Sequence, residues 1–212
     1  MCSVTVIIPA YNEGKTIGEV IKVVKKVKLV DKVIVVSDGS VDNTVDIAKK
    51  HDVEILELVN NIGKGGALSK GVDATYSEII LFLDADLIGI NEQHVIDLLI
   101  PVIDGEVDMT IGVFTNGRFT TDLAQKVAPY LSGQRAIKRY IFENIPGIDI
   151  TRYGVEVALT KYVANNNIKS KEVTLKNLTH VMKEEKLGLV KGFASRLKMY
   201  WDIVKILTNI DR

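Results

Sequence analysis

Residues 79 to 86 read Ile-Ile-Leu-Phe-Leu-Asp-Ala-Asp, a run of five apolar residues that ends in two aspartates. A short continuous apolar run predicts a strand that is buried on both faces, as in a parallel sheet. Carboxylates two positions apart at the end of such a strand can both reach one hard cation, directly or through water. Asp84 and Asp86 are therefore predicted to hold a divalent ion, although turn or helix-capping aspartates give the same local pattern.

Short apolar runs and amphipathic helical stripes alternate over the first 114 residues. Strands that alternate with helices form right-handed parallel crossovers, with helices on both faces of the sheet. We therefore predict an α/β fold built on an open, doubly wound, mostly parallel sheet. The predicted strands are residues 4–8, 33–36, 53–58, 79–83 and 107–114, and the predicted helices are residues 16–28, 42–51, 65–74 and 91–103.

A polar or glycine-rich segment follows each of the first four predicted strands. In doubly wound sheets, ligands bind at the carboxyl ends of the strands. The convergence of four such segments at one edge indicates a ligand site more strongly than any one of them alone. The segments are Tyr11-Asn12-Glu13, Asp38-Gly39-Ser40, Asn60-Asn61-Ile62-Gly63-Lys64-Gly65 and Asp84-Ala85-Asp86.

Two of these segments have the chemistry of a nucleotide site. The glycines around Lys64 let backbone N–H groups approach a phosphate, and the helix that follows offers its positive end. Asp38 can accept a hydrogen bond from a base N–H or a ribose hydroxyl. The alternatives are a glycine-rich turn with a solvated lysine and an Asx turn at Asp38.

A second glycine-lysine pair, Gly14-Lys15-Thr16, suggests a P-loop but does not fit one. The P-loop pattern requires a glycine where this chain has Pro9, which has no N–H to offer a phosphate. We interpret Thr16 as a helix cap, with Glu19 at capping-box spacing. Two of the histidines, His51 and His94, fall on predicted helices and are expected at the surface.

The composition excludes several classes of protein. The chain has 212 residues, of which 47% are hydrophobic, enough for the core of one α/β domain. Lys plus Arg and Asp plus Glu number 27 each, so the basic footprint of a nucleic-acid binder is missing. Cys2 is the one cysteine, which rules out a disulfide framework. No apolar stretch is long enough for a membrane span or a signal peptide, so we expect a cytoplasmic protein.

The alternation fades after residue 114. Residues 120–145 are predicted to be helical with a break at Pro129, followed by a helix at 153–164, a strand at 173–178 and a long helix at 187–207. The last helix has one apolar face bordered by lysines and Arg196. It can pack on the domain, pair with a second subunit in a homodimer, or lie on an anionic membrane surface; we favour packing or dimerisation.

Together these motifs resemble the family 2 glycosyltransferases with a GT-A fold. The matching segments are Ile7-Ile8-Pro9-Ala10-Tyr11-Asn12-Glu13, Asp38-Gly39-Ser40 with Asp42 and Thr44, Asn61-Ile62-Gly63-Lys64-Gly65, and Asp84-Ala85-Asp86. The resemblance implies a nucleotide-sugar donor, with its base and ribose near Pro9, Tyr11, Glu13 and Asp38. It also implies phosphates near Lys64 and a Mg²⁺ or Mn²⁺ cofactor at Asp86. Ser37 departs from the pattern, because many members carry an aspartate there.

The second half contains Asn116-Gly117-Arg118-Phe119-Thr120, Ser132-Gly133-Gln134-Arg135-Ala136 and Tyr153-Gly154-Val155-Glu156. In these segments it is similar to the glucosyl-3-phosphoglycerate synthases. The resemblance implies an acceptor phosphate loop at 116–120, a segment preceding a helix at 132–136, and an acceptor element at 153–156. It also places His180 where that group has a metal-binding histidine. Asn116, Gln134 and Arg152 depart from its pattern. The residues implied to bind the acceptor are Gly117, Arg118, Thr120, Gln134, Arg135, Tyr153 and Glu156.

We therefore expect a metal-dependent hexosyltransferase that uses a UDP- or GDP-linked sugar and a small phosphorylated acceptor such as 3-phosphoglycerate. A polyprenyl phosphate or other lipid-linked acceptor, a sugar nucleotidyltransferase and a non-catalytic nucleotide-sugar sensor are the alternatives. We expect a single domain with a donor half (1–114), an acceptor half (115–185) and a C-terminal helical extension (186–212). The expected catalytic residues are Asp86, Glu156 and Lys64; the donor site is Pro9, Tyr11, Asn12, Glu13, Asp38, Gly39, Ser40, Asn61, Gly63, Lys64, Gly65, Asp84 and Ala85; the metal ligands are Asp84, Asp86 and His180.

Overall fold

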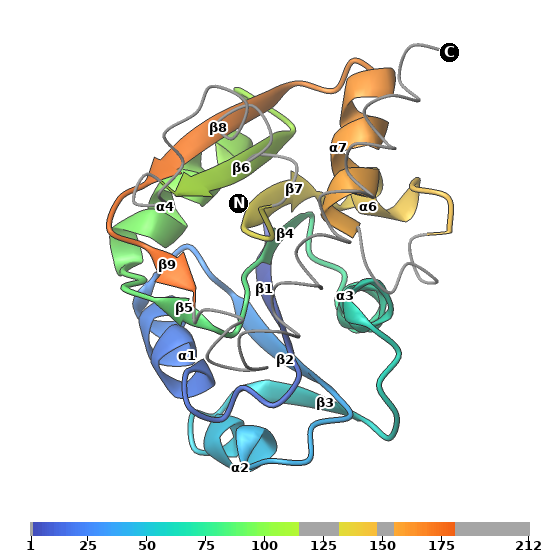
Figure 1. The fold of residues 1–212 in the computed structure, drawn as a ribbon. Coiled ribbons are helices and arrows are strands. Elements are labelled where there is room, and N and C mark those ends of the chain that lie inside the picture. The colour runs from blue at the N-terminus through green and yellow to red at the C-terminus, as the bar shows by residue number, and fades with distance from the viewer. Residues whose placement is uncertain (1, 115–131, 148–154, 181–212) are drawn as a thin grey trace, which may run out of the picture. The chain divides into compact units, whose positions relative to one another are not determined.

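The computed structural model describes residues 2–114, 132–147 and 155–180 of the chain (Figure 1). The contacts divide the chain into one compact unit, Met1–Thr179, and a second, His180–Arg212. The packing described below is that of the first unit. The predicted boundaries at 114 and 185 stay predictions, and the predicted helix at 187–207 lies outside the described residues.

A seven-stranded mixed sheet is the centre of the first unit, in the order β3-β2-β1-β4-β7-β6-β8. Strands β1 to β4 are parallel to one another, β7 runs antiparallel to both β4 and β6, and β8 is parallel to β6. This confirms the predicted open, mostly parallel α/β sheet. The strands are β1 (Val4–Ala10), β2 (Lys32–Asp38), β3 (Glu54–Leu58), β4 (Ile79–Phe82), β6 (Met109–Phe114), β7 (Arg135–Lys138) and β8 (Ser170–Leu175), and β5 (Leu87–Ile88) pairs separately with β9 (Thr179–His180).

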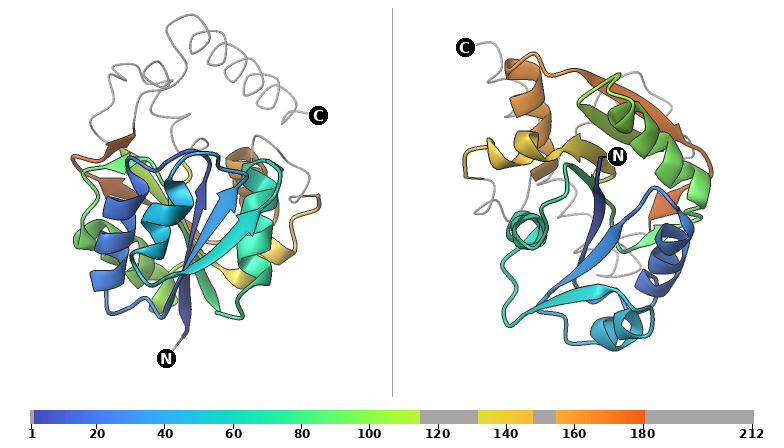
Figure 2. Two further views of the ribbon diagram at one scale, coloured as in Figure 1. Left: turned by 90° about the horizontal axis from the view of Figure 1, so that it is seen from below. Right: turned by 180° about the vertical axis from the view of Figure 1, so that it is seen from behind.

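Helices cover both faces of this sheet (Figure 2). One hydrophobic core joins α1, α2 and α4 to one face, and a second joins α3, α6 and α7 to the other. Alternate residues of β1 enter the two cores: Val6 and Ile8 the first, Ile7 the second, all 0% exposed. The helices are α1 (Ile17–Lys26), α2 (Thr44–Lys49), α3 (Lys64–Asp73), α4 (Glu92–Ile103), α6 (Arg139–Glu143) and α7 (Val155–Asn165). None of the described helices is long and apolar enough to cross a bilayer.

Gly71 lets α3 lie close to the sheet. A Cβ atom added there would lie 2.5 Å from Ile7 Cγ2 and 3.2 Å from Val36 Cγ2. Both neighbours are β-branched side chains buried in the core, so they cannot swing away. The position of α3, whose first residue is Lys64, therefore depends on the missing side chain.

The predicted helix at 120–145 is wrong at Arg135–Lys138, which form β7. This strand pairs with β4 on one side and with β6 on the other, so its conformation is imposed by tertiary pairing. The helix that follows this strand, α6, begins at Arg139, and the predicted helical residues 120–131 lie outside the described part of the chain. The late predicted strand, 173–178, is present as β8 but begins and ends earlier, at Ser170 and Leu175.

Two local predictions also need correction: the cap at Thr16 and the surface position of His94. Thr16 is the residue before α1, but its hydroxyl donates to the Glu13 carbonyl and no capping bond forms.

His94 is buried, with 6% exposure, rather than at the surface. Its Nδ1 accepts from the Asn91 N–H at 3.3 Å, so Nε2 carries the proton and donates to the Lys176 carbonyl at 2.9 Å. The imidazole is buried because it caps its own helix.

Candidate active site

The loops that follow β1, β2, β3 and β4 lie at one edge of the sheet because these four strands are parallel. Two of the loops turn through glycines with left-handed backbone conformations, Gly39 (φ 71°) and Gly63 (φ 89°). A Cβ at Gly39 would lie 2.8 Å from the Asn61 nitrogen, so the loops after β2 and β3 pass in direct contact. The predicted donor-site segments are thus neighbours in space.

Asp38 holds the glycine-rich loop in place. Its Oδ1 accepts from the Ile62 N–H at 2.7 Å and its Oδ2 from the Gly63 N–H at 2.9 Å, while Asn61 Nδ2 donates to the Asp38 carbonyl at 3.1 Å. The residue is only 4% exposed. We call Asp38, Ile62 and Gly63 the Asp38 anchor. The carboxylate predicted to contact the donor is therefore also a support for the loop that follows β3.

The loop after β1 is tied to the loop after β2. Asn12, itself left-handed at φ 58°, donates its N–H to Ser40 Oγ at 3.1 Å, and its Oδ1 accepts from the Val41 N–H at 2.8 Å. The Glu13 N–H donates to Thr44 Oγ1 at 2.8 Å. These bonds leave the Tyr11 side chain on the surface, 50% exposed. An aromatic ring presented in this way is available for stacking on a base.

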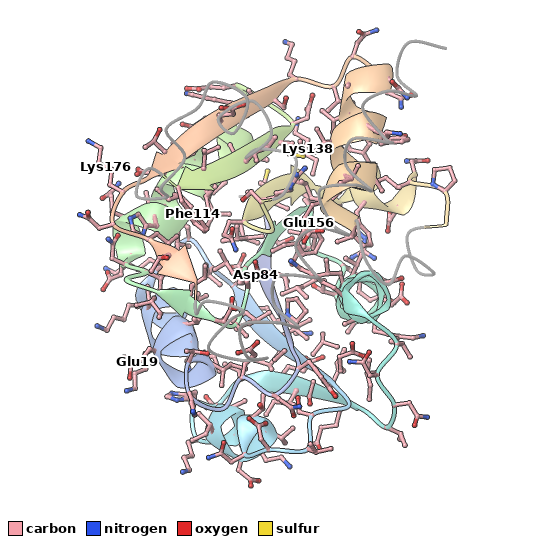
Figure 3. All side chains as sticks on the ribbon, in the orientation of Figure 1. Glu19, Asp84, Phe114, Lys138, Glu156 and Lys176 are labelled. Carbon is pink, nitrogen blue, oxygen red and sulfur yellow. The ribbon has the colours of Figure 1, made fainter. Side chains whose placement is uncertain are left out.

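Lys64 joins two carboxylates from distant parts of the chain. Its Nζ lies 2.6 Å from Asp84 Oδ1 and 2.6 Å from Glu156 Oε1. Figure 3 shows Asp84 and Glu156 close together near the centre of the view. Burial disfavours the ammonium charge, but the two carboxylates outweigh it and raise the pKa of Lys64 above its usual value. We call Lys64, Asp84 and Glu156 the Lys64 bridge.

Residues at the start of β7 complete the surroundings of Asp84. Gln134 is 0% exposed, and its Nε2 donates to Asp84 Oδ2 at 2.8 Å. A Cβ at Gly133 would lie 2.5 Å from Lys64 Nζ and 2.7 Å from both Asp84 carboxylate oxygens. The main chain at Gly133 therefore passes directly against the Lys64 bridge, where any side chain would displace the charged groups.

Arg135, predicted to bind the acceptor, has its side chain in the interior at 1% exposure. Its Nε donates to the Ser132 carbonyl and its Nη2 to Thr160 Oγ1, both at 2.9 Å. Burial lowers the pKa of Arg135 to about 10, and attraction to Glu156 opposes that shift. The guanidinium thus contacts protein groups behind the Lys64 bridge. Thr160 was not predicted, and nothing in its local sequence marks it.

Asp84 and Asp86 suit a hard divalent cation by their chemistry. Both are partly buried carboxylates at the edge of the sheet. Within the described residues no group of three or more His, Cys, Asp or Glu side chains is gathered as a complete metal site. Mg²⁺ is usually bound by one or two carboxylates together with substrate phosphates and waters, so two aspartates are sufficient protein ligands.

Five of the predicted site residues cannot be placed. Gly117, Arg118, Thr120 and Tyr153 lie outside the described residues. His180 belongs to strand β9, but its side chain is outside the description as well. Their roles in acceptor and metal binding stay predictions.

The model of the family described as glycosyl transferase family 2 matches residues 5–161. That range includes every loop of the site described above. The chain is a family 2 glycosyltransferase. The resemblance inferred from the motifs is thereby confirmed, and so is the expectation of an enzyme.

Relatives of this glycosyltransferase differ in how much of the chain they match. An uncharacterized protein of Methanocaldococcus jannaschii is 29% identical over 92% of this chain and 89% of its own length. Glucosyl-3-phosphoglycerate synthase of Mycobacterium tuberculosis is 30% identical over 74% of this chain, which spans 59% of that enzyme's length. Dolichyl-phosphate beta-glucosyltransferase of Drosophila melanogaster is 40% identical, but over only 39% of this chain.

Solved structures of the Mycobacterium tuberculosis synthase share the fold of this glycosyltransferase. The alignment has a TM-score of 0.71 and 27% identity, and covers 85% of this chain and 72% of the synthase chain. The synthase is seen with Mn²⁺, UDP and glucosyl-3-phosphoglycerate in one structure and with Mg²⁺ and UDP in another. Its GT-A fold confirms the predicted fold class.

Proposed function

We propose that this glycosyltransferase moves a hexose from a UDP- or GDP-linked donor to a small phosphorylated acceptor such as 3-phosphoglycerate. The Lys64 bridge is the observation that carries the proposal. It places a lysine of the predicted donor loop 2.6 Å from Glu156, a residue of the predicted acceptor half. Similarity to glucosyl-3-phosphoglycerate synthase over 74% of the chain supports the choice of acceptor.

The donor would lie along the carboxyl edge of the sheet. Tyr11 is exposed on the loop after β1, which is bonded to the loop after β2, a suitable position for stacking on the base. Lys64 would turn from its carboxylates toward the diphosphate and stabilise the charge that develops on the leaving group, the largest electrostatic contribution expected in this reaction. When bound, a Mg²⁺ or Mn²⁺ ion at Asp84 and Asp86 would neutralise the same diphosphate.

The acceptor would lie on the side of the site formed by α7. Glu156 is partly buried at the first turn of this helix, where its carboxylate can orient a sugar or acceptor hydroxyl. Gly117, Arg118, Thr120 and Tyr153 would bind the acceptor's anionic group, for which a planar guanidinium is well suited. His180 would contribute to the metal site.

A panel of UDP- and GDP-sugars tests the proposal. Each is incubated with the chain and 3-phosphoglycerate, with Mn²⁺ or with EDTA, and released nucleoside diphosphate and glycosylated product are measured. We expect Mn²⁺-dependent release that requires the acceptor. Thermal stabilisation by a nucleotide sugar without any turnover would identify a non-catalytic sensor. The absence of both stabilisation and turnover with every donor would refute the proposal.

A lipid-linked acceptor is the second candidate. The 40% identity to dolichyl-phosphate beta-glucosyltransferase, although confined to 39% of this chain, favours it. The same panel therefore includes a polyprenyl phosphate in detergent beside 3-phosphoglycerate. Product formed only with the polyprenyl phosphate would replace the small acceptor and would favour the membrane-surface alternative for the helix predicted at 187–207.

Two substitutions separate the donor side from the acceptor side. Asp86→Ala is expected to abolish Mn²⁺-dependent binding of the nucleoside diphosphate, measured by calorimetry, while the fold survives. Arg118→Ala is expected to raise the KM for the phosphorylated acceptor and to spare donor binding. Unchanged diphosphate binding in the first variant, or an equal loss of donor binding in the second, would overturn the corresponding assignment.

A further inference from the structure

The segment that leads into β7 contacts the Asp84 carboxylate directly and the backbone of Glu156 through one intermediate. Because β7 is antiparallel to β4, its first residues lie beside the carboxyl end of β4, with Arg135 opposite Phe82. Gln134 and Arg135 are neighbours in sequence and are both buried, at 0% and 1% exposure. Gln134 directly precedes β7 and Arg135 is its first residue, and the two side chains reach different partners.

Gln134 acts on Asp84. Its Nε2 donates to Asp84 Oδ2 at 2.8 Å, while its Oε1 accepts from Ser132 Oγ at 3.1 Å. These contacts orient the amide with its nitrogen toward Asp84 and its oxygen toward Ser132. Asp84 Oδ1, in turn, is 2.6 Å from Lys64 Nζ. With both oxygens engaged, the plane of the Asp84 carboxylate is fixed.

Arg135 acts on Glu156 through one intermediate. Its Nη2 donates to Thr160 Oγ1 at 2.9 Å, and Thr160 Oγ1 donates to the Glu156 carbonyl at 2.8 Å. The Nε group is held by the Ser132 carbonyl, on the same segment. This chain of bonds ties the first turn of α7, which carries Glu156, to the start of β7.

We propose that residues 132–135 are a positioning segment that sets the separation of the two carboxylates, with Gln134 orienting Asp84 on the donor side and Arg135, through Thr160, orienting Glu156 on the acceptor side. The inference rests on the proposed function. Gln134 and Arg135 were predicted to bind the acceptor directly, but their side chains are buried. The positioning role proposed here takes the place of that prediction. Gly133 is part of the positioning segment because, without a side chain, its main chain can lie directly against the Lys64 bridge.

The two ends of the segment should therefore produce different kinetic signatures. Gln134→Met removes the amide donor to Asp84 and is expected to weaken Mn²⁺-dependent UDP or GDP binding about 10-fold, in the range typical for groups that orient metal ligands. Gln93→Met is the matched control, since the exposed Gln93 also donates to an aspartate, Asp97, at 2.7 Å. Its nucleotide affinity should equal that of the parent. Gly133→Ala is a second variant with the same expected sign.

Thr160 tests the other end without removing a buried charge. Thr160→Val deletes the hydroxyl between Arg135 and Glu156 and is expected to lower kcat about 10-fold through misplacement of Glu156, with nucleotide affinity unchanged. Thr160→Ser keeps the hydroxyl and should restore kcat. Thermal unfolding of every variant shows whether it is folded.

The inference is overturned if Gln134→Met and Gly133→Ala bind UDP and GDP with Mn²⁺ as tightly as the parent. It is equally overturned if Thr160→Ser is as impaired as Thr160→Val, or if Thr160→Val loses nucleotide affinity instead of kcat. A parent chain that binds neither UDP nor GDP and transfers no sugar would refute the proposed function and this inference together. If the parent chain binds the nucleotide and transfers the sugar, but the variants do not separate a loss of nucleotide affinity from a loss of kcat, the inference alone is refuted.

Discussion

The Asp38 anchor and the Lys64 bridge lie at the same edge of the sheet, yet their aspartates are held by different kinds of donor. Asp38 accepts from two backbone N–H groups at 2.7 and 2.9 Å, whereas Asp84 is held by the side chains of Lys64 and Gln134 at 2.6 and 2.8 Å. Backbone donors cannot leave without reshaping the loop, but a lysine side chain can rotate toward a ligand. The Asp38 anchor therefore holds the shape of the loop after β3, whereas in the Lys64 bridge the lysine can move its charge from the two carboxylates to a bound ligand.

The largest expected effect comes from removing the exchangeable charge. Lys64→Met deletes the cation that serves both carboxylates and the predicted diphosphate, so kcat should fall about 10²- to 10³-fold, or about 2.7–4 kcal/mol. Steady-state kinetics at saturating donor and acceptor measure it. Lys70→Met, on the exposed side of the same helix, is the control and should keep the parental kcat. A fully active Lys64→Met enzyme would show that the Lys64 bridge, like the Asp38 anchor, has only a structural role.

The next effect should appear in stability rather than in turnover. Asp38→Asn replaces one acceptor oxygen with an NH₂ group that faces a backbone N–H. We expect the free energy of unfolding to fall by about 2 kcal/mol, as for the loss of a hydrogen bond to a buried charged group. Urea denaturation measures it, with Asp46→Asn on the exposed face of α2 as control. If Asp38→Asn lowered kcat as much as Lys64→Met while unfolding normally, Asp38 would belong to the chemistry instead.

A third substitution lies near the amino end of β1. Thr5 Oγ1 is buried 2.9 Å from Thr75 Oγ1 and 2.8 Å from Ser77 Oγ, at the opposite end of β1 from the loops of both regions. Thr5→Val removes one hydroxyl but leaves the other two paired with each other, so unfolding should become easier by about 1 kcal/mol. The nucleotide affinity and kcat should not change. A loss of activity without a loss of stability would show that the two ends of the sheet are not functionally separate.

The smallest effect concerns Asp42, which supports the loop after β1. Burial alone would raise its pKa, but hydrogen bonds from Thr44 and the Gly14 N–H lower it below its ordinary value of 3.8. The unfolded chain then binds the proton more readily, so the contribution is present above pH 3.8 and is lost as the pH falls through the folded value. Because Asp42 is exposed, the contribution is about 0.5 kcal/mol after solvent screening. Asp42→Asn should flatten the acid limb of the stability profile; an unchanged acid limb would contradict this.

The donor half was readable from the sequence because its signals are local. Each of β1, β2 and β4 contains a continuous apolar run, and a polar segment follows at the edge where ligands bind. The parallel strands place these segments at one edge, but β2 and β1 lie between β3 and β4, so the ion pair of Lys64 with Asp84 could not be predicted from the motifs alone. What the motif could not show is that Asp38 is occupied by the backbone of Ile62 and Gly63, since both donors come from another loop.

The second half was less readable because its contacts are set by distant partners. Arg135–Lys138 contains only two apolar residues, Ala136 and Ile137, and shows no alternation, so nothing local distinguishes it from a helix. Its pairing with β4 and β6 decides the conformation. Inside the protein Arg135 is hydrogen-bonded to Thr160, which lies 25 residues later in the chain. His94 was misplaced for a similar reason, since the Lys176 carbonyl that binds it lies 82 residues away.

Gly71 carries a mechanical consequence for the charged groups at the other end of its helix. It lies about two turns of α3 beyond Lys64 and touches neither a charge nor a loop of the site. A Cβ atom at Gly71 would lie 2.5 Å from Cγ2 of the rigid Ile7 side chain, so α3 would have to tilt away from the sheet. The displaced end would carry the Lys64 ammonium with it. A complete substitution scan should therefore rank Gly71 with the active-site residues, although the atoms that an added Cβ would meet there are all hydrocarbon.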